Sequence, residues 1–401
     1  MKNIGEILEY IEDNGVKFVK LSFCDILGRH RNVSVNASHF AEAADGFIVD
    51  PAAFGSSSCG TDIGGLLLIP RPETFTPMPW RPSSGAVVSV MCRAERADGK
   101  PFGCDCGEIA ENADRLFTEK TGCTVRLMTE SEFYIFRTDD RGEPTLVPVD
   151  NAGYLDAAPR DRCENLRRDI VFTLETMGMQ PLSSHHEKGR GQNAVIFREC
   201  APYMSAVNTV LFRSAVRNIA YTNGLYASFA PCPVDGEIGS NFRVVASLYR
   251  GGKPVAERDA EAFARGVEAR ISEMAAFTNP VGNSYDRLAL STTPCGIAGE
   301  GRKPAVRVQR GGKAEIMFAD TACNPFTSLA LMLAAGAEGM TGEKQPAPSR
   351  IPTSLGSALD IAENSDFIKK NLPEEYLSRY FAYKRRAAGR TGREDVIAAG
   401  Y

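Results

Sequence analysis

A segment in the middle of the chain combines metal-binding side chains with the pattern of a hairpin. Residues 183–197 read SSHHEKGRGQNAVIF, in which His185, His186 and Glu187 come directly before a glycine-rich turn. Imidazole and carboxylate groups are common ligands of divalent cations. The segment therefore predicts a cation-binding hairpin, although Ala194 places a methyl group where such a cage would need an oxygen.

Four acids in strand-like runs strengthen this prediction. Glu130 and Glu132, in TESEFYIF, would share one face of a strand about 6.6 Å apart. Two such carboxylates repel each other unless a cation lies beside them, but from this segment alone a solvated strand end with ordinary surface acids is the preferred interpretation. Glu187 and Glu315 add two more acids. A Mg²⁺ or Mn²⁺ site is thus possible, although spacing does not show that the four meet.

The elements that must position these acids follow a mixed pattern. Residues 16–92 read as short strands and turns, with a proline-rich loop over 70–85, and a boundary is expected near residue 103. Helices are expected over 1–15, 107–121, 163–177, 203–223, 258–277 and 325–340, and strands over 16–23, 85–92, 125–136, 225–230 and 242–249. A small β-rich unit followed by interleaved helices and strands predicts an α+β protein.

Composition narrows the class of protein further. The 401 residues suggest at least two domains, and the net charge of −4 gives no basic footprint for nucleic acid. The acidic N-terminal helix is not a signal peptide, and no apolar run is long enough to span a membrane. Eleven cysteines without a CxxC pair indicate reduced thiols. We therefore expect a cytoplasmic protein without nucleic-acid or membrane partners.

The order of the motifs resembles the glutamine synthetase family of the bacterial type over nearly the whole chain. The resemblance is carried by VKFVKLSFCDILGRHRNVSV, GFIVDPAAF, PETFTPMPW, ESEF, HHEKGRGQN, IGSNFRVVASL, NPVGNSYDRL, KPAVRV and EIMFADTACNPFTSLALMLAAGAEGM. It implies a β-grasp N-terminal domain over residues 1–103. It also implies a catalytic domain over 104–401, built on an antiparallel sheet with flanking helices.

The resemblance also implies an activity and an assembly. ATP would phosphorylate the γ-carboxylate of glutamate, and ammonia or another amine would displace the phosphate. Mg²⁺ or Mn²⁺ would neutralise the charge on the phosphates, as phosphoryl transfer generally requires. The active site would lie between subunits of a homo-oligomeric ring, either a hexamer or a stacked dodecamer.

Individual roles carry over to positions that match the family motifs. The matched metal ligands are Glu130, Glu132, Glu187 and Glu315. The matched catalytic residues are Asp50, which helps to bind and deprotonate ammonium, Arg287, which grips the amino acid, and Arg302, which faces phosphate. The expected ATP-binding residues are Ser247, Arg307, Arg310 and Lys313, and Gly239 matches the substrate loop.

Several positions depart from the family pattern, and they concentrate in the active site. By the resemblance, Ala194 replaces a metal-binding glutamate, Arg243 a metal-binding histidine and Thr293 the glutamate of a flap, for which Glu300 could stand in. The remaining departures are Val245 for a second histidine, Met317 for an arginine, Ile238 for an asparagine, and a C-terminal segment without the usual tryptophan-bearing tail.

These departures give two expectations about cations. Arg243 should enter the cavity beside Glu130 and Glu315 as an internal cation that replaces one metal ion, because Phe242 and Val244 would point the other way.

The metal position nearest Glu132 and Glu187 should be weak. Neither Gln192 nor Asn193 is expected on the face of Ala194.

The sequence thus predicts a ligase scaffold that is impaired as a glutamine synthetase. Two alternatives stay open. One is an ATP-dependent ligase that joins a different acid or amine, and the other is a non-catalytic member with a binding, regulatory or assembly role.

Overall fold

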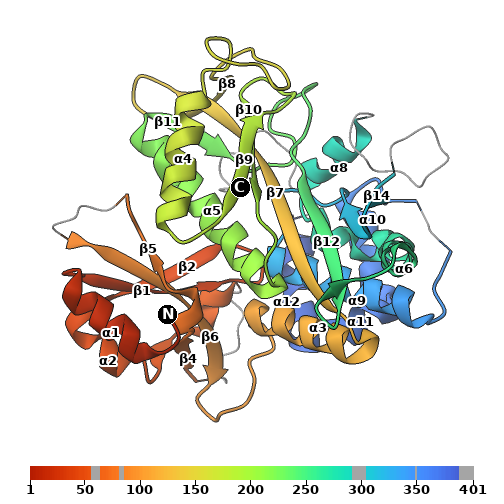
Figure 1. The fold of residues 1–401 in the computed structure, drawn as a ribbon, viewed down its shortest axis with the longest axis horizontal. Helices are drawn as coiled ribbons and strands as arrows, with labels where there is room; N and C mark the ends of the chain where they lie inside the picture. The colour runs from red at the N-terminus through yellow and green to blue at the C-terminus, as the bar shows by residue number, and fades with distance from the viewer. Residues whose placement is uncertain (56–63, 81–84, 291–303, 348–349, 388–401) are drawn as a thin grey trace.

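The chain folds around two β-sheets, each covered by helices (Figure 1). The structure is a computed structural model, and it describes residues 1–55, 64–80, 85–290, 304–347 and 350–387. The two sheets confirm the expected β-grasp unit followed by a larger α+β domain. The predicted boundary at residue 103 lies between the last strand of the first sheet and the first helix of the second domain, and it stays a prediction.

The N-terminal domain holds a six-stranded sheet in the order β2-β1-β6-β4-β3, with β5 paired to β6. Its strands are β1 (Phe18–Cys24), β2 (His30–Asn36), β3 (Phe47–Val49), β4 (Leu66–Pro70), β5 (Thr76–Pro77) and β6 (Val87–Arg96). Its helices are α1 (Ile4–Asp13), α2 (Phe40–Ala43), η1 (Ala37–His39), η2 (Pro51–Phe54) and η3 (Pro72–Thr74). Asn3 caps α1 through its side chain, and Ile7 and Ile11 bury the apolar face of that helix.

The second domain holds a nine-stranded sheet in the order β14-β15-β12-β7-β10-β9, in which β8 and β11 also pair with β7, and β13 with β12. All its strand pairs are antiparallel. The strands are β7 (Thr124–Thr138), β8 (Pro144–Pro148), β9 (Pro181–His186), β10 (Gln192–Phe197), β11 (Leu225–Ser228), β12 (Phe242–Arg250), β13 (Lys253–Pro254), β14 (Val306–Gln309) and β15 (Lys313–Ile316).

Helices pack against this sheet and against one another (Figure 1). They are α3 (Cys106–Thr121), α4 (Glu164–Thr176), α5 (Pro202–Thr222), α6 (Glu257–Ala269), α7 (Ile271–Thr278), α8 (Gly282–Ala289), α9 (Pro325–Thr341), α10 (Leu355–Asn364), α11 (Asp366–Asn371) and α12 (Glu374–Ala387). In the residues that the structure describes, none of the helices combines the length and the apolar character that crossing a membrane requires.

One predicted helix is wrong in detail. The helix expected over 258–277 is two helices, α6 and α7, which meet at Arg270. The backbone of Arg270 leaves the helical region, with φ −105° and ψ 4°. Its guanidinium is held by Glu273 and Glu338, so a contact distant in sequence accompanies a break that the apolar periodicity did not reveal.

Candidate functional site

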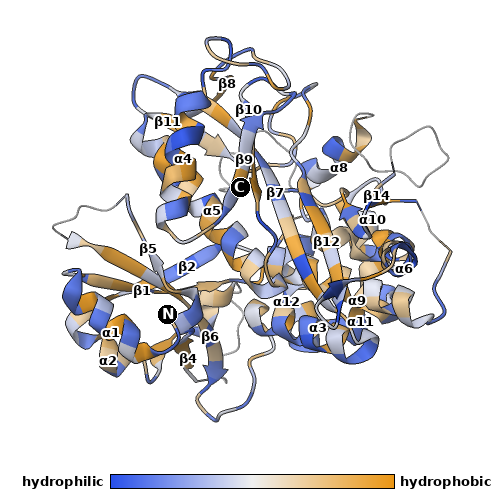
Figure 2. Ribbon diagram, in the orientation of Figure 1, coloured by the Kyte–Doolittle hydropathy of each residue, from blue (hydrophilic) through white to orange (hydrophobic). Residues whose placement is uncertain are grey.

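Alternation along strand β7 places Glu130 and Glu132 on the face opposite to Phe133. Figure 2 shows polar and apolar residues following one another along this strand. Phe133 points toward the helices and packs edge-on against Phe212 of α5, with ring centroids 5.8 Å apart. Glu130 and Glu132 therefore lie on the opposite face, where both are buried. Burial of two carboxylates on one face requires compensating donors or cations.

Arg243 supplies a cation between two of the predicted metal ligands. It lies directly across from Glu130 in the pairing of β12 with β7. Its Nε donates to Glu130 Oε2 at 2.8 Å, its Nη1 donates to Glu315 Oε1 at 2.7 Å, and its Nη2 also contacts Glu130 Oε2. Phe242 and Val244 point into the core, as the alternation predicted. The guanidinium therefore joins carboxylates from β7 and β15.

A second arginine extends this ion network to the next strand. Arg307 lies across from Glu315 in the pairing of β14 with β15, and its Nε donates to Glu315 Oε2. Burial raises the pKa of Glu315, but the hydrogen bonds from Arg307 and Arg243 outweigh it, so the net pKa is below the usual value. Burial also raises the pKa of Glu130, and Arg243 only partly offsets that increase. The network is thus fully paired on the Glu315 side.

Glu132 is satisfied by neutral donors. Its Oε2 accepts from Gln192 Nε2 at 3.0 Å and from the backbone N–H of Asn241 at 2.9 Å, and its Oε1 accepts from Asn241 Nδ2 at 3.1 Å. Burial, followed by repulsion from Glu187 and Glu130, raises the pKa of Glu132 to about 8. The carboxyl group therefore lies in a site that disfavours its charge.

The expectation that Gln192 would point away from this face is wrong. Residues two apart on a strand share a face, so Gln192 lies on the same side of β10 as Ala194. Its amide reaches Glu132, and its own Oε1 accepts from the backbone N–H of Gly189 at 3.0 Å.

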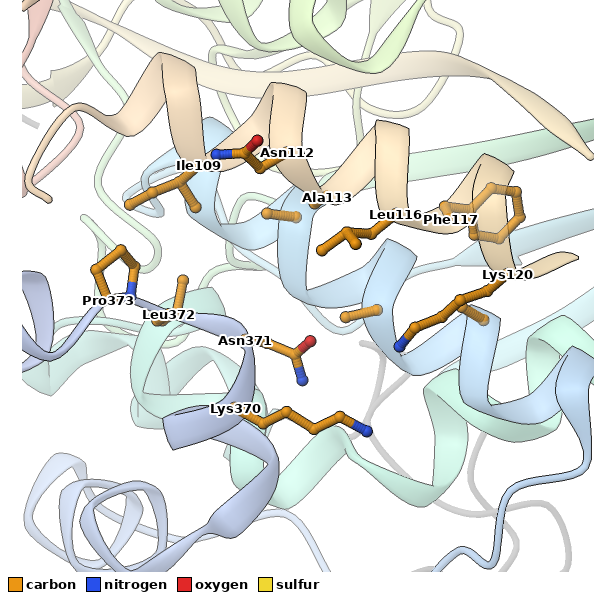
Figure 3. A pocket seen from close by; sticks show the side chains of 13 residues that line it. Ile109, Asn112, Ala113, Leu116, Phe117, Lys120, Lys370, Asn371, Leu372 and Pro373 are labelled. Carbon is orange, nitrogen blue, oxygen red and sulfur yellow. The ribbon is translucent and has the colours of Figure 1, made fainter. Parts of the chain in front are cut away.

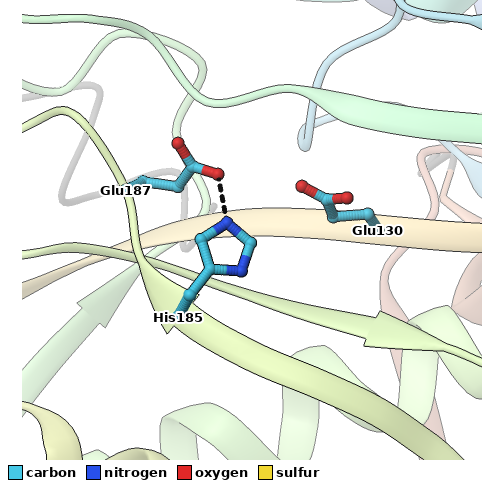
Figure 4. Close-up of side chains that lie close together, drawn as sticks. All are labelled: Glu130, His185 and Glu187. Atoms are coloured by element: carbon cyan, nitrogen blue, oxygen red, sulfur yellow. Dashed lines mark hydrogen bonds and ion pairs between the residues drawn. The ribbon is translucent and has the colours of Figure 1, made fainter. Parts of the chain in front are cut away.

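Glu187 is joined by His185, which the sequence placed in the predicted cation-binding hairpin but the family resemblance did not assign as a metal ligand. His185 Nε2 lies 2.7 Å from Glu187 Oε1, and Glu130 faces the same point (Figure 4). One ligand atom from each of Glu130, His185 and Glu187 lies within 4.8 Å of the others. The neighbouring His186 points elsewhere, with its Nε2 3.1 Å from Asp150 Oδ1. The donors on this side, two carboxylates and one imidazole, suit a divalent cation.

A second acid–histidine cluster is part of the framework. Asp150, Asp161 and His186 also place ligand atoms within 4.8 Å of one another. Asp161 is paired with Arg167, and Arg167 Nη1 also donates to Asn193 Oδ1 at 2.6 Å. Protein donors already bind the carboxylates of Asp150 and Asp161. The cluster therefore connects α4 to β9 and β10 and stabilises their packing.

Two of the predicted ATP-binding residues, Ser247 and Lys313, lie beside the carboxylate of Glu199. Ser247 Oγ donates to Glu199 Oε2 at 2.6 Å, and the hydroxyl of Tyr249 donates to Glu199 Oε1 at 2.6 Å. Lys313 lies 3.7 Å from the same carboxylate. Burial raises the pKa of Glu199, but these hydroxyl donors outweigh it and the pKa is lowered. Arg310 is exposed in the turn between β14 and β15.

Arg287 is held at the base of the site by protein oxygens. It is fully buried, and its guanidinium donates to Asn241 Oδ1, to Asn279 Oδ1 at 2.8 Å and to the carbonyl oxygen of Phe318 at 2.6 Å. A side chain at Gly239 would meet Arg287 Cγ at 2.2 Å, so only glycine fits there.

The other predicted residues lie apart from the acidic cluster or outside the described chain. Asp50 is exposed in the N-terminal domain, where its Oδ1 accepts from the backbone N–H of Ala52 at 2.7 Å and caps η2. Arg302, Thr293 and Glu300 lie outside the described residues, as does the C-terminal segment 388–401. Their predicted roles stay predictions.

A cavity of about 250 Å³ lies between α3, α9 and α11 (Figure 3). Its walls include Leu116 and Leu372, and Lys120 and Lys370 also line it. None of the predicted site residues belongs to its described lining. The cavity is therefore separate from the acidic face of the sheet.

Comparisons with known proteins agree with the two-domain layout. A family model described as "Glutamine synthetase, beta-Grasp domain" matches residues 15–94, and one described as "Glutamine synthetase, catalytic domain" matches residues 108–394. The glutamine synthetase of Methanosarcina mazei is 33% identical over 94% of this chain and 92% of its own length. That of Clostridium saccharobutylicum is 32% identical over 94% and 93%.

Solved structures show the same fold. A chain described as "Apo GmaS without ligand" superposes with a TM-score of 0.86 at 22% identity, covering 98% of this chain and 99% of that chain. A "novel glutamine synthase homolog" gives a TM-score of 0.82 at 22% identity, covering 96% and 99%.

Proposed function

Because this chain belongs to the glutamine synthetase family, we propose that it keeps the family's ATP-dependent carboxylate–amine ligase scaffold but is impaired as a glutamine synthetase. The observation that carries this proposal is Arg243, which lies between Glu130 and Glu315. The substrates would be a small amino acid or amine and ATP.

Arg243 competes with a metal ion for both carboxylates. Its guanidinium keeps its positive charge at any accessible pH, and its planar donors match carboxylate oxygens. The attraction of Glu130 and Glu315 raises its pKa further, in spite of burial. A divalent ion could bind there only after displacing this group, so we infer that Arg243 replaces one metal ion.

The remaining acids are suited to hold one ion more weakly. Glu187 and the oxygen of Glu130 that Arg243 does not contact offer negative charge, while the oxygens of Glu132 already accept hydrogen bonds from Gln192 and Asn241. A Mg²⁺ or Mn²⁺ ion bound there would supply neutralisation of phosphate charge. This chain's own part would be to place Arg307, Arg310 and Lys313 near the phosphates and to orient the substrates.

The carboxylate of Glu199 favours the alternative of a non-catalytic member. The Glu199 carboxylate accepts a hydrogen bond from the hydroxyl of Ser247 and lies beside Lys313. A nucleotide phosphate that approached these two residues would therefore meet a negative charge. In that case the scaffold would serve binding, regulation or assembly. Asp50 and the N-terminal sheet would then contribute to a homo-oligomeric ring without ammonium chemistry.

The decisive experiment measures ATP turnover with Mg²⁺ and with Mn²⁺ over a panel of amino acids and amines. We expect no robust formation of glutamine from glutamate and ammonia. Removing one electrostatic donor from a site of this kind typically costs about 10² to 10³ in rate. Turnover with another acid or amine would identify the ligase, whereas none with any pair would favour the binding role.

A matched double variant tests the cause of the impairment. Arg243→His combined with Ala194→Glu restores the two ligands that the family resemblance implies, and it should raise ATP turnover if the site is a disabled ligase. The single variants are the controls, since each restores only one position.

Strong glutamine synthesis by the unmodified protein would overturn the proposal, and sedimentation as a monomer at micromolar concentration would overturn the predicted ring.

A further inference from the structure

The face of the sheet that bears Arg243 continues along β12 to a second polar cluster. Residues two apart on a strand share a face, so Ser247 and Tyr249 lie on the same side of β12 as Arg243. At about 3.3 Å per residue, Ser247 lies about 13 Å further along the strand than Arg243. An extended nucleoside diphosphate can span that length. A nucleotide whose phosphates lie beside Arg243 and Arg307 would therefore place its base near Ser247.

Glu199 presents a charged carboxylate at this second cluster. Its Oε2 accepts from Ser247 Oγ at 2.6 Å, and its Oε1 accepts from the hydroxyl of Tyr249 at 2.6 Å. Burial raises the pKa of Glu199, but the two hydroxyl donors and the nearby cations outweigh it, so the net pKa is below the usual value. Arg126 Nη2 also donates to the backbone carbonyl oxygen of Glu199 at 3.0 Å, which fixes the residue beside the sheet.

The carboxylate of Glu199 keeps capacity for a ligand. An ionised carboxylate offers about four acceptor positions on its two oxygens, and the two hydroxyls use one position on each oxygen. Arg126 Nε and Lys313 Nζ lie 3.7 Å from its oxygens, which is beyond hydrogen-bond distance. The side chain of Glu199 is 23% exposed, so a ligand can reach it. Among the described residues, one acceptor position on each oxygen is thus left for two neighbouring donors.

Guanine is the base whose edge matches this carboxylate. Its N1–H and N2–H₂ groups are adjacent donors, and they fit the two oxygens of one carboxylate in bidentate fashion. Adenine places the acceptor N1 beside the donor N6–H₂, so its lone pair at N1 would face a negative charge. A site that is built to hydrogen-bond one group rejects an analogue that lacks it, because the buried partner is then left unpaired.

We propose that Glu199 makes the nucleotide site of this chain selective for guanine nucleotides. The inference rests on the proposed function, because it requires that the scaffold binds a nucleotide, and it replaces ATP by GTP as that nucleotide. Glu199 accepts from N1–H and N2–H₂ of the base, while Ser247 and Tyr249 hold the orientation of the carboxylate. The same negative charge repels a phosphate and so directs the base, not the phosphates, to this end of the face.

The experiment compares the Mg²⁺ complexes of GDP, IDP and ADP as ligands of the full chain, by titration calorimetry. We expect GDP to bind about 10- to 100-fold more tightly than ADP, which is the discrimination that one bidentate pair supplies. IDP lacks the N2 amino group, so its affinity should lie between the two. ADP binding as tightly as GDP would overturn the inference and leave the ATP-dependent scaffold standing. Binding of none of the three would overturn both.

A near-isosteric variant assigns the selectivity to Glu199. Glu199→Gln offers an amide that can donate to N1 of adenine and accept from N6–H₂. The variant should therefore lower GDP affinity by about tenfold or more and bring ADP affinity to that of GDP or above it. Glu143→Gln changes an exposed acid in the turn between β7 and β8 and is the control, which should keep the order of the parent. An unchanged preference for GDP in a folded Glu199→Gln protein would refute the role of Glu199.

Turnover assays separate this inference from the proposed ligase. GTP and ATP are compared over the same panel of amino acids and amines. Selective binding of GDP without turnover of either nucleotide would support the role of Glu199 and count against a ligase. Turnover of ATP together with tighter binding of ADP than of GDP would support a ligase and overturn the role of Glu199.

Discussion

The two sides of the acidic face differ in the groups that lie beside their carboxylates. On the arginine side, formed by Glu130, Arg243, Glu315 and Arg307, strand β12 supplies a permanent cation that both carboxylates bind. On the histidine side, formed by Glu132, Ala194, His185 and Glu187, strand β10 supplies the neutral amide of Gln192 and the methyl group of Ala194, and the imidazole of His185 on β9 contacts Glu187. Glu130 belongs to the boundary between the two sides.

The difference is between neutral donors on one side and a permanent positive charge on the other. On the histidine side, amide donors hold Glu132, and the methyl group of Ala194 leaves room for another ligand or for water. An added arginine satisfies the acids but introduces a charge that it cannot lose. The directions of the pKa shifts agree with this contrast, because the pKa of Glu315 is lowered on the arginine side while that of Glu132 is raised to about 8 on the histidine side.

The largest expected effect comes from removing the cation of the arginine side. Arg243→Ala should reduce the free energy of unfolding by roughly 2 to 4 kcal/mol, because Glu130 and Glu315 would be left buried without this partner. Chemical denaturation measures the change. Mn²⁺ should raise the melting temperature of the variant more than that of the parent if Arg243 replaces a metal ion.

Arg250→Ala is the matched control for this prediction. Arg250 ends the same strand, is about half exposed and lies 3.7 Å from Asp259, so its loss should change stability by less than about 0.5 kcal/mol. Equal effects of the two substitutions would show that Arg243 is an ordinary surface arginine.

The next largest effect concerns the open position of the histidine side. Ala194→Glu should lower the stability of the metal-free protein by roughly 1 to 3 kcal/mol, because the position is fully buried and close to Glu132. The same variant should bind Mn²⁺ more tightly than the parent if the rest of the cage is intact. Calorimetry with and without Mn²⁺ measures both effects.

Ala194→Gln separates charge from volume in this comparison. Glutamine has nearly the same size as glutamate but carries no charge. Ala194→Gln should therefore lose stability from the added volume but should not bind Mn²⁺ more tightly than the parent. A Gln variant that bound Mn²⁺ as tightly as the Glu variant would contradict the prediction.

The sequence predicted the arginine side well because one strand contains the information. Phe242, Arg243 and Val244 alternate core and site faces, and a period of two fixes the direction of Arg243 once β12 is identified. The family resemblance then indicated which acids it would meet, and the structure places it between Glu130 and Glu315. Its role in place of a metal ion stays a proposal.

The histidine side and the Glu199 contact could not be predicted in the same way. His185 reaches the site only through the register between β9 and β10, and Glu199 reaches Ser247 on a strand that is not its neighbour in sequence. Neither relation has a local signal. Gln192 has such a signal, because it lies two residues before Ala194 and therefore shares its face of the strand.

The pH dependence of stability should differ between the two sides. The pKa of Glu132 is raised above its unfolded value, so this residue favours the folded state at low pH and loses that contribution as pH rises from about 4.5 to about 8. Glu132→Gln should flatten this decline in metal-free protein, where one group contributes a slope of up to about 1.4 kcal/mol per pH unit. Denaturation at several pH values in the presence of a chelator measures the slope.

Glu315→Gln provides the comparison with opposite sign. The pKa of Glu315 is lowered, so this residue stabilises the fold above its unfolded pKa and loses that contribution as pH falls through its folded pKa. The substitution should therefore remove stability near neutral pH and leave the decline between pH 4.5 and pH 8 in place. If Glu132→Gln left that decline unchanged, the contrast between the two sides would not hold.

The smallest expected effect separates the two arginines that share Glu315. The side chain of Arg307 is 53% exposed, whereas that of Arg243 is 25% exposed. Solvent screens the exposed pair, and Arg243 stays in place to satisfy Glu315, so Arg307→Ala should cost less than about 1 kcal/mol. Chemical denaturation of Arg307→Ala, Arg243→Ala and the double variant measures the loss in free energy of unfolding from each substitution and the coupling between the two. Because the two share one carboxylate, the double variant should lose more than the sum of the singles, since Glu315 then keeps neither partner. Additive losses would show that the two arginines act independently and that Glu315 does not link them.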